Sequence, residues 1–129
     1  MPNSFNLSNS KVAASATATL VSCATDTITV GKTTFTGTGS PTTSLHFETD
    51  GTDTADAAAL AAAINAHTDT SKIVVATSAA NVVTITALQK GLIGNHIALT
   101  ETGSTITCTG SGFLAGGTGG ATDAAERLR

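Results

Sequence analysis

The chain has 129 residues, of which 12% are charged and 3% are aromatic, with neither Trp nor Tyr, and its formal net charge is -3. The six basic residues are scattered, which argues against nucleic acid as a partner, because neutralising phosphates takes a basic patch. No apolar run approaches the roughly 18 residues of a membrane span, and the first residues lack the basic segment and apolar core of a signal peptide. We therefore expect one domain, made in a cytoplasm, with neither nucleic acid nor membrane as a partner.

Residues 1–15 are polar and irregular apart from isolated apolar side chains, so we expect an extended N-terminal arm. Residues 16–120 then form a single β-rich domain, because they are rich in Thr, Val and Ile, whose branched Cβ favours strands. The first strand is expected over residues 17–22, "TATLVS". Residues 121–129 form a C-terminal tail with no evident place in the core.

The stretch "TITVGKTTF" (residues 27–35) allows two interpretations. Its Gly-Lys-Thr-Thr run matches the end of a phosphate-binding loop, but such a loop needs a glycine where Asp26 stands, five residues before Gly31. A two-residue hairpin turn at Gly31-Lys32 explains more, because glycine readily adopts the positive φ of a type II′ turn. We predict the hairpin, with Val30 opposite Thr33, Thr29 opposite Thr34 and Ile28 opposite Phe35.

Residues 36–52 have loop chemistry, interrupted by a short strand at 45–47. A helix is predicted over residues 54–67, "TADAAALAAAINAH", with Asp53 as its N-cap and Asp56 in the first turn, where negative charge is favourable. Its apolar positions recur at helical spacing, so this stripe is expected to face the core. The stripe consists of Ala57, Leu60, Ala61 and Ile64.

Residues 72–88 predict two strands around a loop at 78–81, with Thr77 opposite Val82. That pairing places Val74, Ala76, Val83 and Ile85 on one face, under the helix. No residue from 73 to 89 is charged, so this apolar, strand-prone run must be central in the sheet or covered by a partner. Further strands follow within residues 91–101 and 104–117. The expected fold is α+β: a mostly antiparallel sheet of about six strands, one Ala-rich helix packed on it, and arms at both ends.

The polar residues predict no catalytic, metal or cofactor site. Aspartates three apart in "ETDGTDTAD" do not match the alternating ligands of a calcium loop, and helix capping accounts for two of them. The three histidines are isolated in sequence and lack the spacing of a zinc enzyme. Cys23 and Cys108 are expected as free thiols. Recurring Thr-x-Thr is explained by strand periodicity. We expect a protein that is not an enzyme.

Five segments in order resemble a module of tailed-bacteriophage virion structural proteins: "DTITVGKTTFT", "TADAAALAAAINAH", "VVTITAL", "GLIGNHIALTETG" and "FLAGGTGG". The most specific pieces are Ala63-Ile64-Asn65 and the Gly91-x-x-Gly94-Asn95-x-Ile97 pattern. The resemblance covers about residues 26–120 and keeps the order and approximate spacing of the segments.

The resemblance implies a virion protein, and a capsid decoration (cement) protein that stabilises the head shell is the leading expectation. A tail component, such as a tube, sheath-associated or fibre protein, is the alternative within virions. A carbohydrate-binding surface module is the alternative from another class, although such sites usually present aromatic platforms. The expected partners are the major capsid protein or another virion protein and further copies of the chain, with a trimer inferred by analogy. Partner contacts are assigned to three apolar residues of the arm, Phe5, Leu7 and Val12.

Overall fold

The computed structural model describes residues 11–119, and within this range the chain forms eight strands, one α-helix and one 3₁₀ helix. The strands make two four-stranded sheets, β5-β6-β1-β8 (the first sheet) and β4-β3-β2-β7 (the second sheet). Their bounds are β1 Ser15–Leu20, β2 Thr27–Val30, β3 Thr33–Thr38, β4 His46–Glu48, β5 Val74–Ala79, β6 Val82–Ala87, β7 Leu99–Glu101 and β8 Ile106–Cys108, with α2 at Asp53–Ala66 and η2 at Leu92–His96.

The α+β class and the predominance of strands are confirmed, whereas the single sheet of about six strands is wrong. Alternating apolar residues mark each strand, but they do not show which strands pair. The first sheet is built across long sequence separations, since β1 pairs with both β6 and β8. All pairs are antiparallel except β3 with β4, which run parallel. The second sheet therefore contains the one departure from the antiparallel pattern among the described strands.

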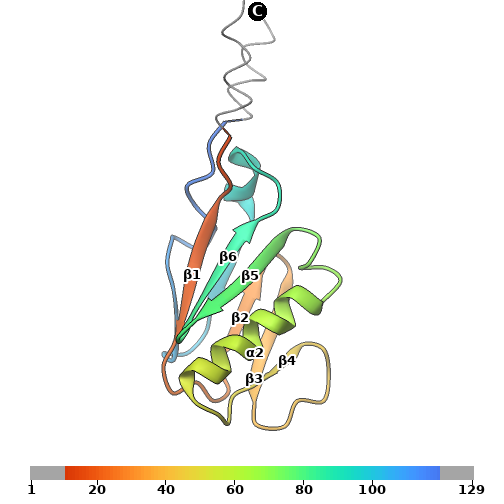
Figure 1. The fold of residues 1–129 in the computed structure, drawn as a ribbon, viewed down its shortest axis with the longest axis vertical. Helices are drawn as coiled ribbons and strands as arrows, with labels where there is room; N and C mark the ends of the chain where they lie inside the picture. The colour runs from red at the N-terminus through yellow and green to blue at the C-terminus, as the bar shows by residue number, and fades with distance from the viewer. Residues whose placement is uncertain (1–10, 120–129) are drawn as a thin grey trace, which may run out of the picture.

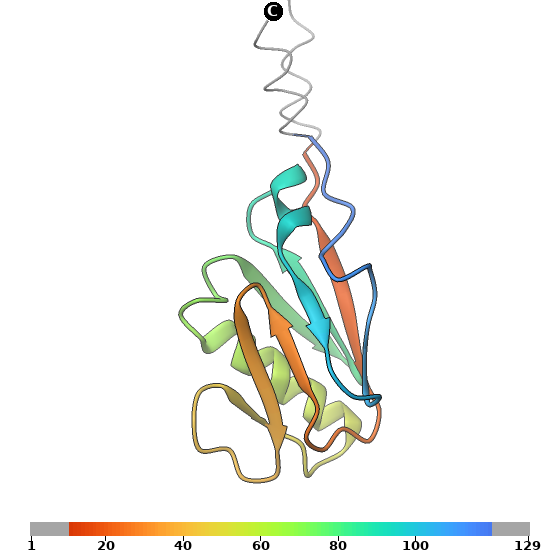
Figure 2. The same cartoon turned by 180° about the vertical axis from the view of Figure 1, so that it is seen from behind.

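The two sheets enclose a common core that α2 closes on one side. The strands β7 and β8, at one edge of each sheet, contact each other, and α2 contacts β5 and β4 at the opposite edges. Figure 1 shows α2 in front of β2 and β3, and Figure 2 shows this hairpin from the other side, with the helix behind it. The largest buried side chains come from all three layers, among them Leu20, Ile85, Ile28, Phe35, Leu60 and Ile64.

The β2–β3 hairpin is confirmed in its turn and its register. Val30 lies opposite Thr33, Thr29 opposite Thr34 and Ile28 opposite Phe35. Gly31 has a φ of +65°, and Lys32 is not among the described non-glycine residues with positive φ, which is the pattern of a type II′ turn. The Gly-Lys-Thr-Thr run therefore forms the turn between β2 and β3 and the start of β3. Its backbone is folded as a hairpin and not as a phosphate-binding loop.

The β5–β6 hairpin has the predicted buried face but a different register. Thr77 lies opposite Thr84 rather than Val82, and only Ala80 and Asn81 remain in the turn. Ala80 takes a φ of +51°, a conformation unfavourable for alanine, and the sequence has no glycine there to signal so tight a turn. A shift of two residues keeps every side chain on its face. Hence Val74, Ala76, Val83 and Ile85 are all buried as predicted.

The helix presents the predicted stripe to the core, since Ala57, Leu60, Ala61 and Ile64 are buried. Its N-cap is Thr52 rather than Asp53: the Thr52 side chain accepts a hydrogen bond from the Ala55 backbone N–H. Asp53 instead accepts a hydrogen bond from the Ser22 backbone N–H at 2.8 Å. The strand β5 lies at a sheet edge, but α2 packs against it and covers the inward face of the apolar run, whereas Val75 and Leu88 of that run remain exposed.

The part of the predicted arm that the structure describes belongs to the packed domain. Ala14 is completely buried, and its carbonyl accepts a hydrogen bond from the Ala87 backbone N–H. Val12 forms a two-way backbone bridge with Thr118. The boundary expected between residues 15 and 16 therefore lies too late in the chain. Residues 1–10, with Phe5 and Leu7, and the predicted tail at 121–129 lie outside the described residues.

Candidate interaction surface

The Ala-Ile-Asn motif in α2 has a structural role. Asn65 pairs its side-chain amide with the backbone of Ala76 in β5: Nδ2 donates to the Ala76 carbonyl, and Oδ1 accepts from the Ala76 N–H, both at 2.8 Å. The side chain therefore takes the place of a neighbouring strand at the exposed edge of the first sheet. An unpaired strand edge is a site for unwanted association, and Asn65 blocks part of it.

Asn95, in the second motif, makes the same kind of pair with Gly117. Its Nδ2 donates to the Gly117 carbonyl and its Oδ1 accepts from the Gly117 N–H, both at 2.9 Å. A Cβ on Gly117 would lie 2.4 Å from the Gly91 carbonyl oxygen, so only glycine fits. Asn65 and Asn95, which belong to the motifs that carry the phage resemblance, thus stabilise the fold through backbone hydrogen bonds.

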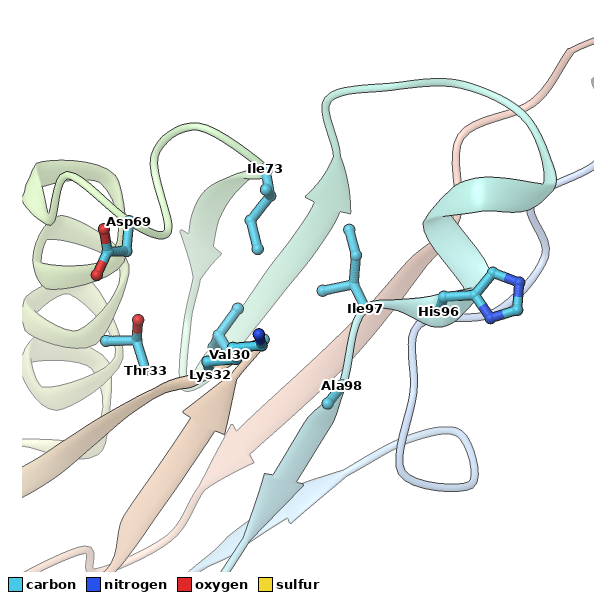
Figure 3. Close-up of a pocket in the computed structure, with 9 residues that line it drawn as sticks. Val30, Lys32, Thr33, Asp69, Ile73, His96, Ile97 and Ala98 are labelled. Carbon is cyan, nitrogen blue, oxygen red and sulfur yellow. The ribbon is translucent and has the colours of Figure 1, made fainter.

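A hollow of about 540 Å³ opens on the surface of the molecule. It lies between the tip of the β2–β3 hairpin, the segment that leads from α2 to β5, and the segment that leads into β7. Figure 3 shows Ile73 and Ile97 on opposite sides of the hollow, with Val30 and Lys32 from the hairpin below them. Asp69 lies on the helix side. Apolar walls with a few polar groups at the rim suit an apolar anchor from a partner protein.

Two further hollows adjoin the first and share lining residues with it. One is lined by Lys72, Leu88 and Ile93 and shares Ile73 and Ile97 with the first. The other is lined by Lys11 and Lys90 and shares His96 with the first. Leu88 and Ile93 are 52% and 54% exposed, respectively. We call this surface the lysine end; it consists of Lys11, Lys32, Lys72 and Lys90 around the exposed apolar residues Leu88 and Ile93.

Val12, assigned to partner contacts from the sequence, lies next to the lysine end. It is 51% exposed, and its carbonyl accepts a hydrogen bond from the Gly91 backbone N–H, just before η2. The other two assigned residues, Phe5 and Leu7, fall outside the described range, so the structure does not bring the three together. The chain nevertheless enters the described fold at this same end, since Lys11 lines one of its hollows.

Carboxylates gather at the opposite end, where α2 begins. We call this surface the acidic end; it consists of Asp26, Glu48, Asp50, Asp53 and Asp56. A hydrogen bond with Asp50 and the negative charge of Asp50 raise the pKa of the Glu48 carboxyl. Burial raises the pKa of Asp56, with the charges of Asp53 and Asp50 adding to the shift and the Gly51 backbone N–H opposing it. These carboxylates repel one another.

The carboxylates of Asp56 and Asp26 differ in the hydrogen bonds that they accept. Asp56 is only 2% exposed, and its Oδ1 has no hydrogen-bond partner, which is unusual for a buried polar atom. Asp26 accepts a hydrogen bond from the Thr105 backbone N–H at 2.8 Å, and hydrogen bonds from Thr105 lower the pKa of its carboxyl. The acidic end therefore contains one well-stabilised carboxylate and one that is poorly compensated.

Among the other titratable residues of the described range, the histidines and cysteines have separate local surroundings. No group of three or more His, Cys, Asp or Glu residues within 11–119 is arranged to hold a metal ion. The His46 Nδ1 accepts from the Thr42 backbone N–H, and His67 packs edge-on against Phe35. Cys23 and Cys108 are free thiols. Burial, aided by Glu101, raises the pKa of Cys108 to about 12, so its reactive thiolate form is suppressed at neutral pH.

No family model matches this chain, and no curated protein sequence matches it. In the part of the chain that the structure describes, no helix is both long and apolar enough to cross a bilayer. The surface itself therefore carries the argument for what the protein does.

Sequence reasoning missed most of the lysine end. The four lysines of the described range are separated by up to 79 positions, from Lys11 to Lys90, so the sequence alone predicts scattered charge. Strand pairing brings them to one end. The one available sequence signal was that each lysine lies at the end of a strand or in a connecting segment, but which segments share an end depends on the topology.

Proposed function

We propose that this chain is a structural protein of a tailed-bacteriophage virion, and specifically a capsid decoration protein that binds and stabilises the head shell in many copies. The order and spacing of five motifs support the virion assignment. The hairpin at Gly31-Lys32 accounts for the Gly-Lys-Thr-Thr run without a nucleotide site. Its place is then the virion, after synthesis in the bacterial cytoplasm.

The observation that carries this proposal is the lysine end beside the entry of the chain into the fold. Val12, Leu88 and Ile93 are each about half exposed. Apolar side chains exposed near one another mark interaction sites on soluble proteins. Residues 1–10 continue from that end and supply Phe5 and Leu7. In the proposed complex these two side chains and Val12 are the apolar anchors on the shell, most directly on the major capsid protein.

The test is a deletion that removes residues 1–10 and leaves residues 11–15 in place. The cut must stop there because Ala14 is buried and Ser15 begins β1. The shortened protein should remain folded by circular dichroism, bind purified shells at least about tenfold more weakly, and fail to protect them against heat or chelator. Undiminished shell binding by the shortened protein would show that the anchors are not in this segment.

A pair of matched substitutions tests Val12 itself. Val12 and Val21 are exposed to similar extents, 51% and 54%, but Val21 follows β1 at the other end of that strand. Val12→Asp should weaken shell binding, whereas Val21→Asp should leave it unchanged. Equal effects of the two changes would remove Val12 from the interface. If the labelled full-length chain is found on tails and never on heads in electron micrographs, the decoration role is wrong and the tail alternative replaces it.

A further inference from the structure

We infer that copies of this chain associate head to tail, with the lysine end of one copy bound to the acidic end of the next. This inference extends the proposed function, because it concerns contacts between copies rather than contacts with the shell. It rests on how charge is distributed over the described fold.

All four lysines of residues 11–119 line the three adjoining hollows of the lysine end. Lys32 is on the hairpin tip, Lys72 is between α2 and β5, Lys90 is between β6 and η2, and Lys11 is where the described chain begins. Lys32, Lys72 and Lys90 are exposed. Within residues 11–119, none of the lysines forms an ion pair with a carboxylate. Asp69 is the one carboxylate that lines the hollows of this end. The end thus presents unpaired positive charge around an apolar centre.

The acidic end offers the complementary charge. Glu48 and Asp50 are exposed, and Asp53 is half-buried at the start of α2. Behind them Asp56 is buried with an unpartnered Oδ1. Nearby cations would relieve the repulsion among these carboxylates, and within the described range no such cation is close enough to pair with them. A lysine-bearing partner surface is therefore the kind of partner that this end fits.

The two ends cannot meet within one copy. The helix α2 has 14 residues and begins at the acidic end, so the start of α2 lies about 20 Å from its last turn. Figure 1 shows α2 starting toward the lower end of the molecule, while the segment after β6 lies toward the upper end. Pairing of complementary charges therefore requires a second molecule.

The same charge distribution disfavours a symmetric dimer that forms through one end alone. A two-fold contact through the lysine end would place lysines against lysines, and one through the acidic end would place carboxylates against carboxylates. A head-to-tail contact joins unlike ends, and it either closes into a ring or continues as an open chain. The trimer expected by analogy is compatible with this contact, because three copies can close into a ring.

Charge exchange tests the inference in full-length protein by sedimentation velocity. Wild-type protein should form oligomers at about 0.05 M salt and dissociate toward monomer at about 0.5 M, because screening weakens the contact. The Lys72→Glu/Lys90→Glu double variant and the Glu48→Lys/Asp50→Lys double variant should each associate at least about tenfold more weakly, since like charges then face each other. The quadruple variant, with both ends exchanged, should regain association.

Mixing provides the second readout. The lysine-to-glutamate double variant has negative charge at both ends, and the carboxylate-to-lysine double variant has positive charge at both ends. An equimolar mixture should therefore associate, although neither variant associates alone. Thr77→Lys/Thr107→Glu serves as a control of surface change, because Thr77 and Thr107 are exposed outside both ends. Circular dichroism should show that every variant is folded.

Three results would overturn the inference: wild-type protein that stays monomeric at low salt, oligomers that neither double variant disturbs, or a quadruple variant that fails to reassemble while folded. The proposed function is read separately, from shell binding. Oligomers of the wild type that never bind shells would reject the decoration role and leave the head-to-tail contact standing. Shell binding by a protein that is always monomeric would do the reverse.

Discussion

Replacing Asn65 by alanine tests whether the Ala-Ile-Asn motif is structural. The change removes two hydrogen bonds to the backbone of Ala76, each worth about 0.5–1.5 kcal/mol net. It also places alanine in a helix, which favours the folded state by up to about 0.7 kcal/mol relative to asparagine. The two effects oppose each other, and the hydrogen bonds dominate. We expect a net loss of about 1–2 kcal/mol in the free energy of unfolding.

The assay is denaturant unfolding followed by circular dichroism, with two control variants. Ala62 is exposed on the same helix, so Ala62→Asn measures the helix-propensity cost of asparagine where no strand edge is in reach. Asn65→Asp keeps an oxygen for the Ala76 N–H but turns a second oxygen toward the Ala76 carbonyl. This variant should be destabilised at neutral pH and recover in part when the carboxyl is protonated, because a neutral carboxyl can donate.

A loss smaller than about 0.3 kcal/mol for Asn65→Ala, after correction by the Ala62→Asn value, would contradict the reasoning, because even one net hydrogen bond exceeds that figure. An unchanged stability combined with lost assembly would assign Asn65 to the partner surface instead.

Three other predictions concern the core, the acidic end and the hairpin. Ile64→Ala should cost about 2–5 kcal/mol in denaturant unfolding, because Ile64 is completely buried; a change below about 0.5 kcal/mol would show that another face of α2 meets the core. Because the pKa of Asp56 is raised in the folded state, the folded state binds that proton more tightly, so stability should fall as pH rises from the ordinary Asp pKa of 3.8 through the raised value. Thermal unfolding between pH 3 and 8 should show a smaller decline for Asp56→Asn, and equal declines would reject this assignment. Isothermal titration with ATP should detect no binding; saturable binding that Lys32→Ala abolishes would overturn the hairpin interpretation of Gly31-Lys32.

The sequence alone was enough to predict those elements whose conformation depends on residues that are close together in the chain. Gly31 between two alternating runs determined the β2–β3 turn and its register, because few residues accept the positive φ that the turn requires. The apolar spacing of Leu60 and Ile64 determined which helix face is buried. The β5–β6 register was missed by two residues because the turn uses Ala80, a residue type that does not mark such turns.

Tertiary structure alone decided the sheet pairing and the surface on which the functional proposals rest. Alternation within β1 shows that one face is buried, but the same pattern fits any partner strand of similar length, so neither β6 nor β8 is specified. Only that pairing brings Lys11, Lys72 and Lys90 together around the adjoining hollows, away from the carboxylates at the start of α2. Charge patches depend on distances in space, and positions up to 79 residues apart carry no local signal of their proximity.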